Sequence, residues 1–357
     1  MQAPARTYSV RASMEDLLVP STEGVYCPAG GFHIDPWRPV ERAVLTHAHS
    51  DHARAGSKAY LCAETCALVA AERVGRDARI ETLRYGEPLR IGSVQVSLHP
   101  AGHVLGSAQV RIERAGEVWV ASGDYKLDRD PTCVPFESVR CDTFLTESTF
   151  GLPVYRWDPP TEFERMNRWW RANQDEGRTS VVYAYALGKA QRVLASVDAS
   201  LGPILVHGAV ARMVSVYRAA GIALPEVLPA NEENAKLHRG TALVVAPPGA
   251  GGTPWLRKFG PVSQSMASGW MRVRGQRRRR GLDAGFVLSD HADWPGLTSA
   301  IDASGASRVL VTHGATDPLV RWLSERGRDA RAWRTEWADA EGAHEDAPDV
   351  DAAAEIA

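Results

Sequence analysis

The chain has 357 residues, of which 44% are hydrophobic and 24% are charged, as is usual for a globular protein. This composition excludes a largely disordered chain, and the length suits one large or two moderate domains. No run approaches the roughly 18 consecutive apolar residues of a membrane span, and the first residues lack a secretory apolar segment. We therefore expect a cytoplasmic protein that does not act at a membrane.

Charge is distributed unevenly, although the formal net charge is only −2. Residues 336–357 hold eight of the 43 acidic residues and none of the 41 Lys and Arg, so the rest of the chain is net basic. We expect this acidic segment to be disordered. The five cysteines are scattered, which favours a reducing compartment. Cys62 and Cys66 are four residues apart on a predicted helix, residues 63–74, and we expect them to be buried rather than to bind zinc.

Short β-branched runs recur along the chain and predict buried strands. Six of them are residues 43–46, 94–98, 118–121, 143–146, 286–289 and 308–312. A histidine or an acidic residue follows each run, namely His47, His103, Asp124, Glu147, His291 and His313. Because a rigid sheet can aim several side chains from its strand ends into one cleft, these residues are candidates for a common site.

Between residues 154 and 283 the pattern changes to alternating strands and helices, which predicts a parallel βαβ domain. The expected strands and helices are 180–184, 188–197, 204–206, 209–219 and 241–246. Since strand-end histidines resume at His291, we infer that this domain is inserted into the first one. The Gly-rich residues 247–254 lack the Gly-Lys-Ser/Thr of a phosphate loop and are expected to form a turn.

The strongest chemical signal is His47-Ala-His49-Ser-Asp51-His52, directly after the first predicted strand. Four ligand-competent side chains in six residues cannot all be buried as neutral core groups without a large desolvation cost, whereas a bound cation satisfies all of them. The sequence therefore predicts a metal site. An exposed histidine-rich turn is the alternative interpretation.

This segment resembles the His-x-His-x-Asp-His loop of the metallo-β-lactamase fold, and further segments follow that family's order. They are His33-Ile-Asp35, His99-Pro-Ala-Gly-His103 and Ser122-Gly-Asp124. The resemblance implies two divalent metal ions: one held by His47, His49 and His103, the other by Asp51, His52 and His313, with Asp124 as a bridge. Asp35 would orient ligands or the attacking water. Imidazole and carboxylate ligands suit Zn²⁺, which we favour, and tolerate Mn²⁺.

Three more segments resemble the motifs of the β-CASP nucleases within that fold. They are Thr146-Glu147-Ser148-Thr149-Phe150-Gly151, Ser289-Asp-His291-Ala-Asp-Trp294 and Val311-Thr-His313-Gly314. The resemblance extends to about Arg334 and implies a layered α/β fold, an αββα sandwich with an inserted βαβ-type β-CASP domain. The expected division is 1–153 and 284–335 for the sandwich, 154–283 for the insertion, and 336–357 for the acidic tail.

The β-CASP resemblance also implies roles for Glu147 and His291, which join Asp35 and Asp51 in the expected catalytic set. A phosphodiester leaves as an alkoxide that needs a proton, and a histidine positioned by a carboxylate supplies one. His291 would therefore be the leaving-group acid or a phosphate ligand, and Glu147 would keep it protonated. The alternatives are a core histidine and an acidic residue in a surface turn.

The compact length and residues 26–31 and 34–39 resemble the bacterial ligase-associated DNA exonucleases. This implies exonuclease action on DNA, 5′ to 3′ with single strands preferred, in repair alongside a DNA ligase and other repair proteins. A β-CASP ribonuclease in RNA processing is the first alternative. A small-molecule hydrolase of the same fold and a metal-free nucleic-acid scaffold are disfavoured, because the β-CASP residues and all the ligands are present.

Residues 272–281 contain six arginines in ten residues: Arg272, Arg274, Arg277, Arg278, Arg279 and Arg280. Two interpretations stay open for them, a solvated loop and a set of contacts to a phosphate backbone. Trp255, Trp270 and Trp294 are expected near the cleft, where they would stack on bases or pack in the core. His207 also ends a predicted strand, but it matches no family motif and is interpreted as structural.

Overall fold

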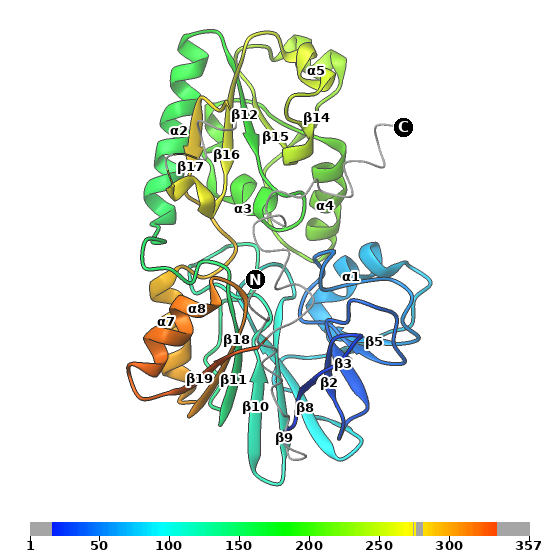
Figure 1. Cartoon of the computed structure of the whole chain (residues 1–357). Coiled ribbons are helices and arrows are strands. Elements are labelled where there is room, and N and C mark those ends of the chain that lie inside the picture. The colour runs from blue at the N-terminus through cyan, green and yellow to red at the C-terminus, as the bar shows by residue number, and fades with distance from the viewer. Residues whose placement is uncertain (1–15, 274, 276–280, 334–357) are drawn as a thin grey trace, which may run out of the picture.

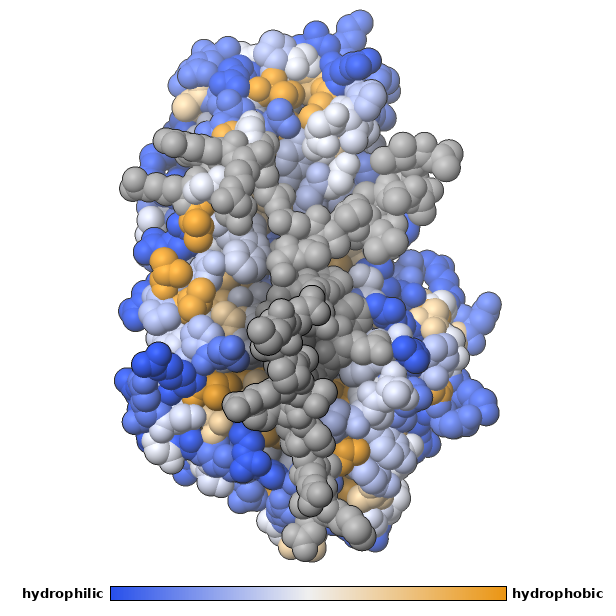
Figure 2. Space-filling model, in the orientation of Figure 1, coloured by the Kyte–Doolittle hydropathy of each residue, from blue (hydrophilic) through white to orange (hydrophobic). Residues whose placement is uncertain are grey.

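The computed structural model describes residues 16–273, 275 and 281–333, which form two lobes (Figure 1). The lower lobe in Figure 1 contains two mixed sheets and the upper lobe contains one parallel sheet. The predicted layered α/β class is confirmed at this level. Within the described ranges, no helix has both the length and the apolar character needed to cross a bilayer. The face seen in Figure 2 is mainly hydrophilic, with apolar residues scattered over both lobes.

The first sheet of the lower lobe contains six short strands in chain order. They are β1 (Val19–Pro20), β2 (Val25–Cys27), β3 (Phe32–Ile34), β4 (Ala43–Val44), β5 (Tyr60–Ala63) and β6 (Ile80–Leu83). The helix expected from residue 63 begins at Ala67 as α1 (Ala67–Val74), because Tyr60–Ala63 pair with β6 and a 3₁₀ turn follows. Cys62 and Cys66 are both buried, as expected.

The second sheet has the order β19-β18-β11-β10-β9-β8-β7. Its strands are β7 (Leu89–Ile91), β8 (Val94–Pro100), β9 (Ala108–Arg114), β10 (Glu117–Ala121), β11 (Thr143–Ser148), β18 (Arg308–Gly314) and β19 (Asp329–Ala332). One core joins the two sheets, with Phe32 on one side and Trp119 on the other. The next residue, Val120, points to the opposite face, where α7 (Trp294–Ser304) and α8 (Thr316–Ser324) pack. The second sheet is therefore buried on both faces.

The upper lobe lies in sequence between β11 and β18, which are parallel neighbours in the lower lobe. Its sheet has the order β14-β13-β15-β12-β16-β17, with every pair parallel. The strands are β12 (Thr179–Tyr183), β13 (Ile204–Val206), β14 (Leu228–Pro229), β15 (Leu243–Ala246), β16 (Val262–Ala267) and β17 (Ala284–Phe286). The helices are α2 (Pro159–Asp175), α3 (Lys189–Ser196), α4 (Gly208–Ala219) and α5 (Glu232–Leu237).

The strand expected at residues 286–289 lies earlier, at Ala284–Phe286, and this shift changes its sheet. These residues pair with β16 of the upper lobe rather than with the lower sheets. The backbone then turns, with Leu288 N donating to Phe286 O, and residues 287–289 return toward the lower lobe outside any strand. The last strand of the upper sheet thus falls in residues that the sequence assigned to the second part of the lower domain.

Tight packing of loops fixes the end of the lower lobe that faces the upper lobe. Ala108 N donates to Thr46 O at 2.7 Å, which joins the loop after β4 to the start of β9. In the loop between β8 and β9, Gly106 has a φ of +75° and approaches the turn before α1 so closely that a Cβ would lie 2.3 Å from the Cα of Cys66. The approach requires glycine, because no side chain fits there.

We expect Gly106→Ala to lower the free energy of unfolding by about 1–3 kcal/mol more than Gly116→Ala, because the added methyl group overpacks the turn at Cys66. Gly116 is a matched control, since its φ of +88° imposes a similar backbone strain and no atom lies within 4 Å of its Cβ position. Urea denaturation of both variants measures the difference. Equal losses would show that the approach of Gly106 to Cys66 does not constrain this loop.

Candidate metal centre

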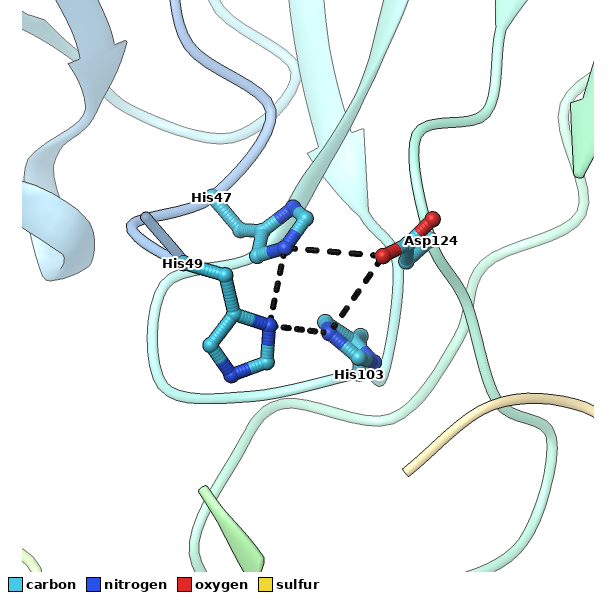
Figure 3. Close-up of side chains that lie close together, drawn as sticks. All are labelled: His47, His49, His103 and Asp124. Carbon is cyan, nitrogen blue, oxygen red and sulfur yellow. Dashed lines mark hydrogen bonds and ion pairs between the residues drawn. The ribbon is translucent and has the colours of Figure 1, made fainter. Parts of the chain in front are cut away.

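Four buried or half-buried side chains from three loops converge where the lower lobe meets the upper lobe (Figure 3). His47 and His49 follow β4, His103 lies between β8 and β9, and Asp124 follows β10. His49 Nδ1 is 3.0 Å from both His47 Nε2 and His103 Nε2. Asp124 Oδ2 is 3.6 Å from His47 Nε2 and 3.8 Å from His103 Nε2. The structure thus brings together the three histidines predicted to hold one ion and the aspartate predicted to bridge the two ions.

Hydrogen bonds on the far side of each ring set the tautomers of the three histidines. His47 Nδ1 donates to Thr46 Oγ1 at 3.1 Å, His49 Nε2 to Leu187 O at 3.2 Å, and His103 Nδ1 to Asp290 O at 2.7 Å. The nitrogens that face one another therefore carry lone pairs. Lone pairs 3.0 Å apart repel unless a cation lies between them. Tetrahedral zinc bonds of 2.0–2.1 Å would place ligand atoms about 3.3 Å apart, so the donor set fits such an ion.

Electrostatics agrees with neutral imidazoles at these three positions. Burial, together with the neighbouring histidines, lowers the pKa of His47 and His103 well below the usual value of 6.5. Burial also lowers the pKa of His49. The three rings are therefore neutral at pH 7, and their lone pairs are available to a metal ion without loss of a proton.

The three residues predicted for the second ion line one small cavity of about 50 Å³ together with Asp124. His52 Nε2 lies 3.3 Å from Asp124 Oδ2 and 3.5 Å from Asp51 Oδ2. The ring of His313 stacks on that of His52, with 6.0 Å between the centroids. The ring of His52 also packs against that of His47, with 4.0 Å between the centroids, so the two groups adjoin each other. Asp124 Oδ2 lies within 4 Å of histidine nitrogens from both groups.

Asp35 is hydrogen-bonded to His52 of this second group and to the neighbouring Thr46. Its carboxylate accepts hydrogen bonds from Thr46 N at 2.7 Å, from Thr46 Oγ1 at 2.5 Å and from His52 Nδ1 at 2.7 Å. Burial disfavours the charged form of His52, but the carboxylates of Asp124, Asp51 and Asp35 together raise its pKa well above 6.5. The φ angles of Asp35 and His313 are +43° and +54°. Such strained backbone is concentrated at functional sites.

Glu147 and His291 form a pair beside this cluster, although 144 residues separate them. Glu147 Oε2 accepts from His291 Nδ1 at 2.8 Å and from Thr149 Oγ1 at 2.6 Å, and Glu147 Oε1 accepts from Tyr125 N at 2.9 Å. Glu147 is 1% exposed, so the interpretation of a surface turn is wrong for this residue. His291 Nδ1 lies 4.0 Å from Asp124 Oδ2, which places the pair next to the candidate metal ligands.

The other candidate residues lie apart from this cluster or outside the described ranges. Arg272 is exposed and donates from Nε to Val154 O at 3.2 Å. Arg274, Arg277, Arg278, Arg279 and Arg280 lie outside the described residues, as does the acidic segment 336–357. His207 Nδ1 accepts from Ala209 N at the start of α4, which agrees with a structural role.

The three tryptophans expected near the cleft have different surroundings. Trp294 is buried with α7 and α8, and Trp255 packs on Phe259 in the upper lobe. Trp270 contacts Phe150, whose ring lies 6.2 Å from that of His291. Only Trp270 of the three is thus linked to the site through a described ring contact.

Sequence reasoning missed the groups that orient the metal-facing histidines. The carbonyls of Leu187 and Asp290 accept from His49 and His103, and the Thr149 hydroxyl joins the Glu147 carboxylate. Backbone carbonyls leave no trace in residue identity, so no sequence signal could have found the first two. Thr149 belongs to the motif at residues 146–151, and its position two residues after Glu147 was a usable signal.

Comparison with known proteins gives partial matches. No protein-family model matches the chain. A "Probable DNA ligase" of Opitutus terrae is 32% identical over 316 residues, which cover 87% of this chain and 30% of the ligase. The endoribonuclease YSH1 of Eremothecium gossypii is 30% identical over 123 residues, covering 34% of this chain and 16% of that protein. The endoribonuclease ysh-1 of Neurospora crassa is 33% identical over 122 residues, covering 33% and 14%. The chain thus spans less than a third of the length of these curated relatives.

A crystal structure of a protein of unknown function from Enterococcus faecalis V583 shares the fold. It superposes with a TM-score of 0.52 over 76% of this chain and 74% of that one, at 13% sequence identity. At this identity the likeness concerns the fold alone.

The purified protein should bind divalent metal, and Asp124→Asn should bind far less, because the carboxylate between the two groups loses its charge while keeping its volume. Removal of metal by a chelator should lower the thermal unfolding midpoint of the wild type, and Zn²⁺ should restore it. Elemental analysis after dialysis gives the metal content. His238→Ala in the upper lobe is the control and should bind metal normally. Normal metal content in Asp124→Asn would contradict the ligand assignment.

Proposed function

We propose that the protein is a metal-dependent nuclease, a phosphodiesterase of the β-CASP branch of the metallo-β-lactamase fold. The observation that carries the proposal is the pair of buried Glu147 and half-buried His291 beside two groups of candidate metal ligands. The pair and the candidate ligands come from distant segments of the chain. Metal ions would activate the attacking water, and the pair would protonate the leaving oxygen. The names of the endoribonuclease relatives support a nuclease. The upper lobe lies in sequence between the neighbouring strands β11 and β18, which supports the proposed β-CASP insertion. Residues 284–286 belong to this insertion, because they pair with β16.

Two divalent ions would supply an activated water at neutral pH and would stabilise the charge that develops on the attacking and leaving oxygens. His47, His49 and His103 would hold one ion, and Asp51, His52 and His313 the other. Zn²⁺ is favoured by the three imidazole nitrogens, and Mn²⁺ is compatible with the carboxylates. Asp124 is the proposed bridge, because its Oδ2 lies within 4 Å of histidine nitrogens from both groups. Asp35 orients His52 through the hydrogen bond at Nδ1.

His291 is the proposed proton donor to the leaving oxygen. Its Nδ1 is bonded to the Glu147 carboxylate, so Nε2 is the atom assigned to carry the proton to the leaving alkoxide. The hydrogen bonds from Tyr125 N and Thr149 Oγ1 fix the Glu147 carboxylate, which in turn fixes the imidazole. The Glu147 carboxylate would stabilise the positive charge of a protonated ring, as a proton donor at this position requires.

DNA is the proposed substrate, because the relative that matches 87% of this chain is named as a DNA ligase, whereas the endoribonucleases match about a third of it. The proposed task is exonucleolytic trimming of DNA ends, 5′ to 3′ and on single strands, in repair alongside a ligase. The arginines at 272–280 are proposed to contact the phosphate backbone. The names of the endoribonuclease relatives support a second candidate, a ribonuclease in RNA processing.

Loss of the acid should slow the reaction without removing the metal. We expect His291→Ala to lower kcat by about 10²- to 10⁴-fold with normal metal content, because the leaving alkoxide then departs without a positioned proton. Glu147→Gln should act in the same direction. A nitrophenyl phosphodiester, whose leaving group needs no proton, should be hydrolysed by His291→Ala at nearly the wild-type rate. An equally large loss on that substrate would favour a phosphate-binding role for His291.

End-labelled single- and double-stranded DNA and RNA, with Zn²⁺, Mn²⁺ or Mg²⁺, test the substrate and the direction. Release of short products from the 5′ end of single-stranded DNA is expected, with RNA cut more slowly. A closed circle of single-stranded DNA should resist digestion, because an exonuclease needs an end. Efficient cutting of the circle would indicate an endonuclease, and equal or faster cutting of RNA would favour the ribonuclease.

A further inference from the structure

Four charged side chains are buried beneath the metal centre, and the proposed reaction uses none of them. Lys126 is 0% exposed, Arg192 is 1%, Asp290 is 3% and Asp130 is 8%. Lys126 and Asp130 belong to the segment after β10, Arg192 belongs to α3 of the upper lobe, and Asp290 precedes His291. Long cationic side chains are rarely fully buried unless they are paired. The burial of these four at the junction of the two lobes therefore requires a reason.

The four side chains balance one another in charge, with two cations and two carboxylates. Lys126 Nζ donates to Asp130 Oδ2 at 2.6 Å and lies 3.8 Å from Asp290 Oδ1. The guanidinium of Arg192 lies 3.7 Å from Asp130 Oδ2 and 3.9 Å from Asp290 Oδ1. Burial favours the uncharged form of Asp130, but Lys126 and Arg192 hold its pKa below the usual range. Each of the two cations thus lies within 4 Å of both carboxylates.

This cluster is not an efficient way to stabilise the fold. Nε and Nη2 of Arg192 and Oδ1 of Asp290 make no hydrogen bond within the described residues. Buried ion pairs with incomplete hydrogen bonding often contribute less to stability than apolar side chains of the same volume. What the charged groups do provide is directional hydrogen bonds to particular backbone atoms. Their targets indicate the role of the cluster.

One set of these hydrogen bonds fixes the metal ligand His103. Lys126 Nζ donates to the backbone carbonyl of His103 at 3.1 Å. The imidazole Nδ1 of His103 donates to the backbone carbonyl of Asp290 at 2.7 Å. Lys126 thus fixes the main chain of His103, and the backbone carbonyl of Asp290 fixes its ring. Partners of this kind orient a ligand and set its affinity for the metal.

Another contact comes from the upper lobe. Arg192 Nη1 donates to the backbone carbonyl of Ser289 at 2.5 Å, and Ser289 Oγ accepts from His291 N at 3.1 Å. Each residue of this short segment therefore has one contact or role. Ser289 accepts the hydrogen bond from Arg192, Asp290 orients His103 through its carbonyl, and His291 is the proposed acid. Arg192 thus connects α3 of the upper lobe to this segment by a direct hydrogen bond.

We propose that Arg192 is a positioning residue, which with Lys126 and Asp130 couples the seating of the upper lobe to the orientation of His103 and His291. The inference rests on the proposed function, because His103 is taken as a metal ligand. In this arrangement the inserted lobe does more than cover the site: without the guanidinium, the Ser289–His291 segment loses its attachment to α3, and the carbonyl that orients His103 is no longer fixed.

The test is Zn²⁺ affinity of the metal-depleted full-length protein, measured by competition with a chelator. Arg192→Met should weaken binding by about 10- to 100-fold, as expected when a group that orients a ligand is lost. Arg192→Lys keeps the charge and one donor, so it should recover part of the affinity. Arg218→Met is the matched control, since Arg218 is an exposed arginine of the same lobe whose Nη2 donates to Pro225 O at 2.7 Å. It should bind Zn²⁺ like the wild type.

The outcomes distinguish positioning from simple support of the fold. If Arg192→Met unfolds at a lower temperature but its folded form binds Zn²⁺ with wild-type affinity, the positioning role is overturned. Should that variant fail to fold, Asp130→Asn takes its place, because it keeps the volume while removing the charge shared by Lys126 and Arg192, and unchanged affinity there is equally contradictory. Absence of Zn²⁺ and Mn²⁺ binding in the wild type would overturn the proposed function, and this inference with it.

Discussion

The constraint on which the site depends is the cost of burying several ligand-competent groups in one place. His47, His49 and His103 turn lone pairs toward one another at the junction of the lobes, and Asp124 adds a carboxylate to the same point. Without a cation, such an arrangement combines desolvation with repulsion between lone pairs. The surrounding structure holds it in place through hydrogen bonds on the outer side of each ring and through strained backbone at Asp35 and His313. The favourable free energy of folding in the rest of the protein offsets this unfavourable local term.

Both lobes contribute to that support, although the candidate ligands come from the lower one. The carbonyl of Leu187, in the loop before α3, accepts from His49, and the carbonyl of Asp290, on the segment that returns from the upper lobe, accepts from His103. Glu147 is the penultimate residue of β11, just before the chain leaves for the upper lobe, and His291 lies where it returns. The insertion therefore brings the carboxylate and the imidazole together at its two ends. A small-molecule hydrolase would need neither this pair nor a second lobe above the metal ligands.

Much of this arrangement was predictable from the sequence, because the candidate ligands follow strand ends and their residue types are distinctive. The dense cluster from His47 to His52, with the separated His103 and Asp124, was sufficient to predict a metal site before any geometry was known. The strand near residue 286 was misplaced, because Phe286 to Ser289 are as apolar as a strand and only pairing with β16 decides where it ends. Lys126 and Arg192 gave no signal, since in a sequence such residues resemble ordinary surface cations. Their burial follows from tertiary packing and from carboxylates distant in the chain.

Crystals grown with Zn²⁺ and measured at the zinc absorption edge test the central claim most directly. Two anomalous peaks are expected, one among His47, His49 and His103 and the other among Asp51, His52 and His313, with the Asp124 carboxylate between them. The expected separation of the peaks is about 3.5–4 Å, as in two-metal phosphodiesterases. Zinc bound only elsewhere on the protein, or the absence of any peak at these histidines, would contradict a metal-dependent nuclease built on this site.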